Sequence, residues 1–363
     1  MSQKINLSDR LGIVAQQGQE PYLSWFIGAD CKLFYVNASW PVCEPVEGEY
    51  DFEWLKIMRD KVYGRGGQIL PNLFSMPGWS DPTQPLIEGW TFNAVGMWKA
   101  ERMKDRFLQY VDVFCREFPD IKNVVFENET NIYRRWRDPK RPFNPVPRSA
   151  LDFMELAVKP AAEVAHDNGK RVIAGSPTLR GQDSRDFAEA LGHFTEFRAA
   201  NKPNENEQSL KRVADFLDIH VYHDKGAAGV NVVNDIKKFF MHFERIKKPI
   251  KYPIYITETG FNEGECFTEL EQFGRAIKGF FGGKVEPYTG EMKQARNYKR
   301  VLEFLETDKK KPVDEQQIKQ LYAFEMFDPP DRKGDFNGLL KLNPDGSVRP
   351  KPAALLLREY WQA

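Results

Sequence analysis

The stretch IKNVVFENETNIYRRW, residues 121–136, decides the fold class, because a short strand pattern runs directly into carboxylates. Asn123–Phe126 is an apolar run of the kind that forms a strand covered on both faces. Glu127, Asn128 and Glu129 follow at once. Polar side chains placed directly after a buried strand are typical of a parallel sheet whose carboxyl ends carry the binding site.

Seven further runs rich in β-branched or aromatic residues occur along the 363-residue chain. The complete set of eight is 11–15, 32–39, 67–75, 121–128, 171–177, 215–222, 252–259 and 320–327. Patterns with helical spacing lie between them, at 52–66, 97–118, 150–169 and 233–248. Strand–helix units repeated in this way, without an obvious linker, predict an α/β protein: a (β/α)8 TIM barrel forming one domain over residues 1–363. A doubly wound sheet is the alternative, but it calls for a Gly-rich phosphate turn after the first strand, and GIVAQQGQEP (12–21) has no such fingerprint.

The charge balance narrows the classes of partner. Lys plus Arg and Asp plus Glu are equal at 52 each, so bulk electrostatic attraction to nucleic acid or to a membrane surface is not expected. No window of about 18 apolar residues is present, and residues 1–12 lack the apolar core of a signal peptide. A cytoplasmic protein is the plain expectation, although a secreted protein without its leader would read the same. The four scattered cysteines predict neither a disulfide framework nor a zinc site.

A second carboxylate ends the seventh run, YPIYITETG (252–260), at Glu258. The ends of the fourth and seventh strands of a barrel face one another across its mouth, so Glu129 and Glu258 could converge on one bound molecule. Two glutamates about 5–5.5 Å apart are what retaining glycoside hydrolysis needs. On the sixth run His220 and Tyr222 share a face, because strand side chains alternate. We therefore expect the Tyr222 hydroxyl to hydrogen-bond Glu258 and help to keep it ionised.

These residues resemble glycoside hydrolase clan A, in the neighbourhood of families 39 and 5, over residues 9–360. The matching positions arrive in the order of the clan and are Trp40, Glu44–Pro45, Gly48, Tyr50–Phe52, Asn128–Glu129, Asn131, His220–Tyr222, Ile256–Gly260 and Gly334–Leu357. The chain departs from the clan pattern at three places. Thr130 stands where the clan usually has proline, the second strand has Tyr35 near the position of an arginine, and Phe324 and Phe327 occupy the region of a tryptophan platform.

The resemblance implies a carbohydrate substrate, no cofactor and no metal. It implies that Glu129 is the acid/base and Glu258 the nucleophile, with Asn128 on the sugar 2-hydroxyl. Tryptophans in the loops after the strands are natural walls for sugar rings, which stack on aromatic faces. The expected substrate-binding residues are Asn128, His220, Tyr222, Trp40, Trp79, Trp136, Asn131 and Phe327.

Several alternatives stay open. Glu127 is a rival acid/base, because strand alternation puts it on the same face as Glu129. A non-catalytic glycan-binding barrel that has lost hydrolytic activity is the second functional hypothesis. A metal-dependent barrel hydrolase is the third, and it is the least favoured, since only five histidines are present and alternation puts His220 and His223 on opposite faces. The basic run of residues 134–148 suggests that the substrate carries negative charge, because arginine forks suit carboxylate or phosphate groups.

Overall fold

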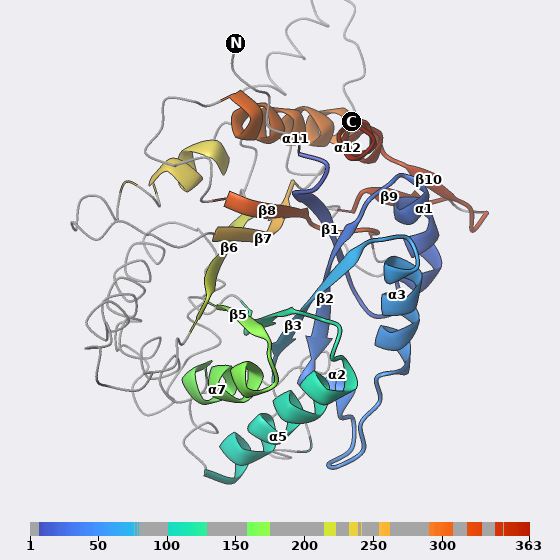
Figure 1. Cartoon of the computed structure of the whole chain (residues 1–363). Helices are drawn as coiled ribbons and strands as arrows, with labels where there is room; N and C mark the ends of the chain where they lie inside the picture. Colours follow the sequence, from blue (N-terminus) through green and yellow to red (C-terminus); the bar gives the residue numbers. More distant parts are fainter. Residues whose placement is uncertain are drawn as a thin grey trace, which may run out of the picture.

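The chain folds around a closed cylinder of parallel strands with helices outside it, as Figure 1 shows. This computed structural model describes residues 7–75, 77, 79, 101–128, 158–174, 214–222, 232–238, 241, 254–261, 290–307, 318–328, 338–343 and 345–363. The barrel strands are β1 (Leu11–Ala15), β2 (Leu33–Ser39), β3 (Gln68–Phe74), β4 (Asn123–Phe126), β5 (Arg171–Ala174), β6 (Phe216–Tyr222), β7 (Ile254–Gly260) and β8 (Ile318–Ala323). Each pairs with its neighbours in sequence, and β1 also pairs with β8, which closes the cylinder.

Every strand predicted from the sequence is present, which confirms the (β/α)8 barrel. The bounds of the last strand were wrong, because the predicted run 320–327 begins at Ile318 and ends at Ala323. The apolar pattern continues past this end since Met326 and Phe327 remain buried after the chain has left the sheet. Phe327 instead forms an isolated bridge with Leu340.

Helices cover the outside of the barrel. They are α1 (Leu23–Gly28), preceded by the 3-10 turn η1 (Glu20–Tyr22), α2 (Trp40–Cys43), α3 (Glu53–Tyr63), α5 (Glu101–Glu117), α7 (Lys159–Asp167), α11 (Gly290–Thr307) and α12 (Pro352–Trp361), and residues 232–238 are also helical. Gly169 follows α7 with φ 71°, the left-handed conformation predicted for a glycine that ends a helix. In the described part of the chain, no helix has the length and apolar character needed to cross a bilayer.

The apolar core forms two clusters, one inside the barrel and one between the strands and the helices. The inner cluster consists of alternate strand residues, namely Val14, Leu33, Tyr35, Leu70, Val125, Ile173, Tyr255 and Tyr322. Tyr35 and Tyr322 approach to 5.8 Å between ring centroids. A Cβ at Gly12 would lie 2.6 Å from the Tyr322 ring, so the aromatic plug requires glycine there. The outer cluster fills the space between strands and helices, as expected for strands buried on both faces.

Polar side chains replace the apolar ones on the inward face as the strands approach their carboxyl ends. Asn37 and Asn72 continue the inward alternation of β2 and β3, and they are register partners. Asp218 and His220 do the same on β6, where both are completely buried. The barrel therefore has an apolar plug below and a polar layer at the mouth, which is where barrel sites are built.

The described cysteines are buried thiols without disulfides. Cys31, Cys43 and Cys115 are free, and Cys266 lies outside the described residues. Burial raises the pKa of Cys43 to about 12, so its thiol stays protonated at neutral pH. Cys43 therefore behaves as a small core side chain rather than as a nucleophile.

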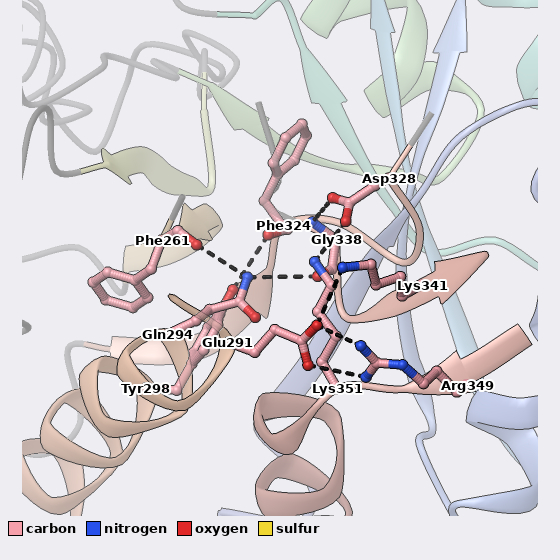
Figure 2. A network of polar contacts seen from close by, with 10 residues as sticks. All are labelled: Phe261, Glu291, Gln294, Tyr298, Phe324, Asp328, Gly338, Lys341, Arg349 and Lys351. Atoms are coloured by element: carbon pink, nitrogen blue, oxygen red, sulfur yellow. Dashed lines mark hydrogen bonds and ion pairs between the residues drawn. The ribbon is translucent and has the colours of Figure 1, made fainter. Parts of the chain in front are cut away.

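A short antiparallel hairpin, which the sequence analysis did not predict, joins the barrel to the last helix. It consists of β9 (Leu340–Leu342) and β10 (Val348–Pro350). Arg349 makes two hydrogen bonds to the carboxylate of Glu291, at 2.9 and 2.5 Å, and Lys341 lies 3.4 Å from the same group (Figure 2). This fork ties the hairpin to α11. It also holds the pKa of Glu291 below its ordinary value, mainly through the hydrogen bonds from Arg349.

The Glu291 fork predicts a pH-dependent part of the stability. Because the folded state lowers the pKa of Glu291, the stabilisation is present above the ordinary value of 4.5 and is lost as pH falls through the folded-state pKa. Glu291→Gln should cost about 1 kcal/mol at pH 7, a modest figure because the pair is partly solvated. The loss should shrink as pH falls below 4.5 and vanish once Glu291 is protonated in the folded state as well. Urea unfolding of both proteins across this range measures the difference.

Glu303→Gln is the matched control on the same helix. Glu303 is half exposed and its contact with Lys299 is 3.8 Å long, so its removal should change stability by a few tenths of a kcal/mol at most. Equal pH dependence for both variants would contradict the role given to the Glu291 fork.

Candidate active site

A β-bulge in β7 turns Glu258 into the barrel mouth. Consecutive residues of β6 pair with Ile256 and Glu258, so that Thr257 is the extra residue. The register with β8 shifts at the same place, between Ile256 and Thr259. Simple alternation from Tyr255, which faces the interior, would point Glu258 outward. The bulge re-aims it inward, which is a common use of bulges at sites.

Two side chains of β6 contact one oxygen of Glu258. The Tyr222 hydroxyl donates a hydrogen bond to Oε2 of Glu258, and Nδ1 of His220 lies 3.3 Å from the same oxygen. An ionised carboxylate can only accept hydrogen bonds, so the tautomer that fits this contact carries its proton on Nδ1. Glu258 is only 5% exposed, so the Tyr222 hydrogen bond and the His220 contact take the place of water around Oε2.

Hydrogen bonds on both sides of Glu258 hold the bulge in place. Thr257 Oγ1 donates to the buried carboxylate of Asp218 at 2.9 Å. Thr259 Oγ1 donates to the carbonyl of Val221 at 2.9 Å. The residue between these two threonines is therefore fixed from both neighbours, and its carboxylate is presented on a rigid strand rather than on a loop.

The end of β4 turns sharply at Glu127. This residue has φ 70°, in the left-handed region, and both Glu127 and Asn128 are buried. Left-handed backbone in a residue other than glycine is uncommon and concentrates at functional sites. Because β4 ends at Phe126 and Glu127 is left-handed, strand alternation is not a basis for placing Glu127 and Glu129 on one face, and their shared face stays a prediction. Glu129 itself lies outside the described residues, as do Asn131, Trp136, His223 and the basic run of residues 134–148.

Trp40 and Trp79 belong to a cluster built around the buried carboxylate of Glu44. Trp40 has no exposed surface and donates from Nε1 to Oε2 of Glu44 at 2.6 Å. Trp79 donates from Nε1 to the Glu44 carbonyl at 2.8 Å, and Arg106 lies 5.7 Å from its ring centre. Arg106 also pairs with the Glu44 carboxylate. A substrate contact needs exposed surface, and Trp40 has none in this packing, whereas Trp79 remains partly exposed.

Phe324, rather than Phe327, lies beside the glutamate. Phe327 is 6% exposed and stacks on Tyr22 at 4.4 Å in the outer core. Phe324 is partly exposed and meets the Tyr222 ring edge-on at 5.5 Å. The sequence analysis placed both phenylalanines in the region of an aromatic platform but gave a binding role only to Phe327. The alternation of β8, continued by one residue beyond Ala323, would have favoured Phe324.

A metal centre is not evident in the part of the chain that the structure describes. No group of three or more His, Cys, Asp or Glu side chains is arranged there to hold an ion. The described arrangement consists instead of a nearly buried carboxylate that accepts a hydrogen bond from Tyr222 on one oxygen and contacts His220 with the same oxygen. Such a group can act as a nucleophile or as an acid/base.

Comparison with known proteins places the fold. Neither a protein-family model nor a curated protein matches the sequence. A β-glucosidase from Exiguobacterium marinum matches in structure with a TM-score of 0.62 at 12% identity, covering 99% of each chain. A family 39 glycoside hydrolase from the gut symbiont Bacteroides cellulosilyticus WH2 gives a TM-score of 0.59 at 16% identity, over 99% of this chain and 65% of that one. A GH10 xylanase from Bispora sp. MEY-1 gives 0.58 at 12% identity, over 97% of each chain.

These solved structures share a barrel and are named for the hydrolysis of glycosides. Identities of this size establish the fold and leave the activity of this chain to be argued from its own residues. The resemblance read from the sequence is confirmed at that level: the chain is a (β/α)8 barrel similar in structure to glycoside hydrolases of clan A.

Proposed function

We propose that the protein is a retaining β-glycoside hydrolase that cleaves an oligo- or polysaccharide, with Glu258 as the nucleophile and Glu129 as the acid/base. One observation carries the proposal. Glu258 is a nearly buried carboxylate at the carboxyl end of a barrel strand, turned inward by a bulge and held at one oxygen by Tyr222 and His220. The similarity in fold to β-glucosidases and xylanases supports it by analogy.

In the first step Glu258 attacks the anomeric carbon. Because both contacts from β6 fall on Oε2, the carboxylate is oriented with Oε1 as the attacking oxygen. The bond from the anomeric carbon to the leaving oxygen breaks as the new bond forms, and Glu129 gives its proton to that oxygen. A glycosyl-enzyme ester and a free alcohol result.

In the second step water replaces the enzyme at the anomeric carbon. Glu129, now ionised, takes a proton from the water, which attacks from the face opposite to Glu258. Two inversions give net retention. Asn128, buried at the end of β4, is assigned to the sugar 2-hydroxyl, an interaction that strengthens as the ring gains oxocarbenium character.

Aromatic rings and the loops after the strands form the walls of the proposed site. Phe324 meets the ring of Tyr222, the donor to Glu258, edge-on at 5.5 Å and is partly exposed. Trp79 is retained as a wall, and Trp136 and Asn131 stay as proposed contacts. Trp40 and Phe327 are given supporting roles, since Trp40 stacks on Tyr110 of α5 and Phe327 stacks on Tyr22 of η1.

The stereochemistry of the first product tests the proposal. Aryl β-glycosides of several sugars are incubated with the protein, and proton NMR records the anomer that appears before mutarotation. We expect the β anomer, because double displacement retains configuration. An α anomer formed first would contradict the mechanism. Glycan binding by calorimetry without any product, unchanged by Glu129→Gln, would point instead to a non-catalytic glycan-binding barrel.

A further inference from the structure

The seam between β7 and β8 is crossed by one hydroxyl group from α11. The Tyr298 O–H lies 3.1 Å from the carbonyl oxygen of Thr259. It lies 3.2 Å from the carbonyl oxygen of Phe324, and Figure 2 shows these two residues. A phenol carries one proton, so these two carbonyls share it. The Thr259 carbonyl also accepts the N–H of Phe324 at 2.8 Å, so Tyr298 completes a small cluster of bonds at this seam.

Tyr298 is itself rigidly held. It has no exposed surface, and Phe261 packs edge-on against its ring at 4.9 Å between centroids. Gln294, one helical turn earlier on the same face of α11, donates to the carbonyl of Phe261 at 3.0 Å and lies 3.5 Å from that of Gly338. Burial raises the pKa of Tyr298 far above its ordinary value, and the nearby charge of Glu325 acts in the same direction. The hydroxyl therefore stays a donor at any working pH.

The two carbonyls that Tyr298 reaches belong to residues that are each linked to the proposed nucleophile, one along the chain and one through Tyr222. Thr259 directly follows Glu258, in the strand segment where the bulge interrupts the regular ladder. Phe324 packs against Tyr222, which holds the Glu258 carboxylate. The chain is tightly packed here, because a Cβ at Gly260 would lie 3.1 Å from both the Phe324 carbonyl oxygen and the Tyr222 ring.

We infer that Tyr298 is a positioning residue for the proposed reaction: by tying the backbones of Thr259 and Phe324 together, its hydroxyl sets the place of the Glu258 carboxylate and of the ring of Tyr222 that orients it. The inference rests on the proposed function for its kinetic consequences. The structural consequence, a shift of the Glu258 carboxylate when the Tyr298 hydroxyl is removed, does not depend on the proposed function.

Tyr298→Phe removes the hydroxyl and keeps the ring. A misplacement of about 1 Å at a reacting group can cost about a hundredfold in rate, so kcat should fall about 10- to 100-fold while KM stays within about twofold. The acid limb of the kcat/KM profile reports ionisation of the nucleophile in the free enzyme. This acid limb should move to higher pH in the variant, because a longer hydrogen bond from Tyr222 stabilises the charged Glu258 carboxylate less.

Tyr110→Phe is the matched control. Tyr110 is equally buried, and its hydroxyl donates to one backbone carbonyl, that of Ala38, at 2.7 Å. Ala38 lies on β2, which β1 and β8 separate from β7 in the barrel order. Each variant loses one buried hydroxyl that donates to backbone, so both should lose a similar amount of stability, about 1 kcal/mol. Only Tyr298→Phe should change kcat and the acid limb.

Crystal structures of the wild type and of both variants separate this inference from the proposed function. We expect the Glu258 carboxylate to shift and its hydrogen bond with Tyr222 to lengthen in Tyr298→Phe and in neither other protein. An unmoved carboxylate, or equal kinetic losses in the two variants, would overturn the positioning role. If the wild type hydrolyses no glycoside, the proposed function fails, and the three structures still decide whether Tyr298 places Glu258.

Discussion

Glu258→Ala should lower kcat on an aryl β-glycoside by about 10⁵-fold, because a double displacement cannot begin without its nucleophile. Added azide should restore much of this turnover. The truncated side chain leaves room for a small anion on the face where the carboxylate stood, and Glu129 can still protonate the leaving group. Azide then attacks once, so the product should be the α-glycosyl azide, with inverted configuration, which NMR of the isolated product identifies.

Glu258→Gln controls for the space that alanine creates. Glutamine removes the charge but fills almost the same volume, so we expect the same loss of activity without rescue by azide. A Glu258→Ala variant with wild-type turnover would remove the nucleophile from the scheme. Equal rescue of both variants would mean that azide acts somewhere other than the vacated position.

Glu129→Ala should lose about 10²–10⁴-fold on substrates with poor leaving groups, the usual contribution of a positioned general acid. A dinitrophenyl glycoside should still form the intermediate quickly, because its leaving group needs no proton, and the intermediate should then accumulate. Azide should relieve this block and give the β-glycosyl azide, with retained configuration. A burst of dinitrophenol measured by stopped flow, followed by product NMR, checks both parts.

Glu127→Gln decides between the two carboxylates at the end of β4. Glu127 is buried in a left-handed turn, and its exchange for glutamine preserves the size of the side chain. A loss of rate that is confined to substrates with poor leaving groups should appear in Glu129→Ala and be absent from Glu127→Gln. Its appearance in Glu127→Gln would transfer the acid/base role to that residue.

Strand periodicity predicted the part of the site that follows from simple alternation. His220 and Tyr222 were expected on one face of their strand, and the hydrogen bond from Tyr222 to Glu258 is present. The positions of the eight strands also followed from the sequence, because a parallel barrel buries both faces of each strand and leaves long apolar runs.

Features that depend on a break in periodicity could not be predicted. The bulge at Thr257 inserts one residue without any glycine or proline to mark it, yet it decides which way Glu258 points. The left-handed turn at Glu127 has the same character. The packing of Trp40 depends on residues distant in sequence. Arg106 pairs with the buried carboxylate of Glu44, and that carboxylate accepts the indole N–H of Trp40.

The contact between the last helix and the first strand has a consequence for how the chain matures during its synthesis. The indole nitrogen of Trp361 donates to the carbonyl of Leu11 at 2.9 Å, across 350 positions of sequence, and residues Leu11–Ile13 of β1 pair with β8. While the ribosome is still translating, β1 can engage β2 but has nothing on its other side. The nascent polypeptide must therefore keep one open, apolar edge until β8 and α12 have left the ribosome, and chaperones would matter most up to that stage.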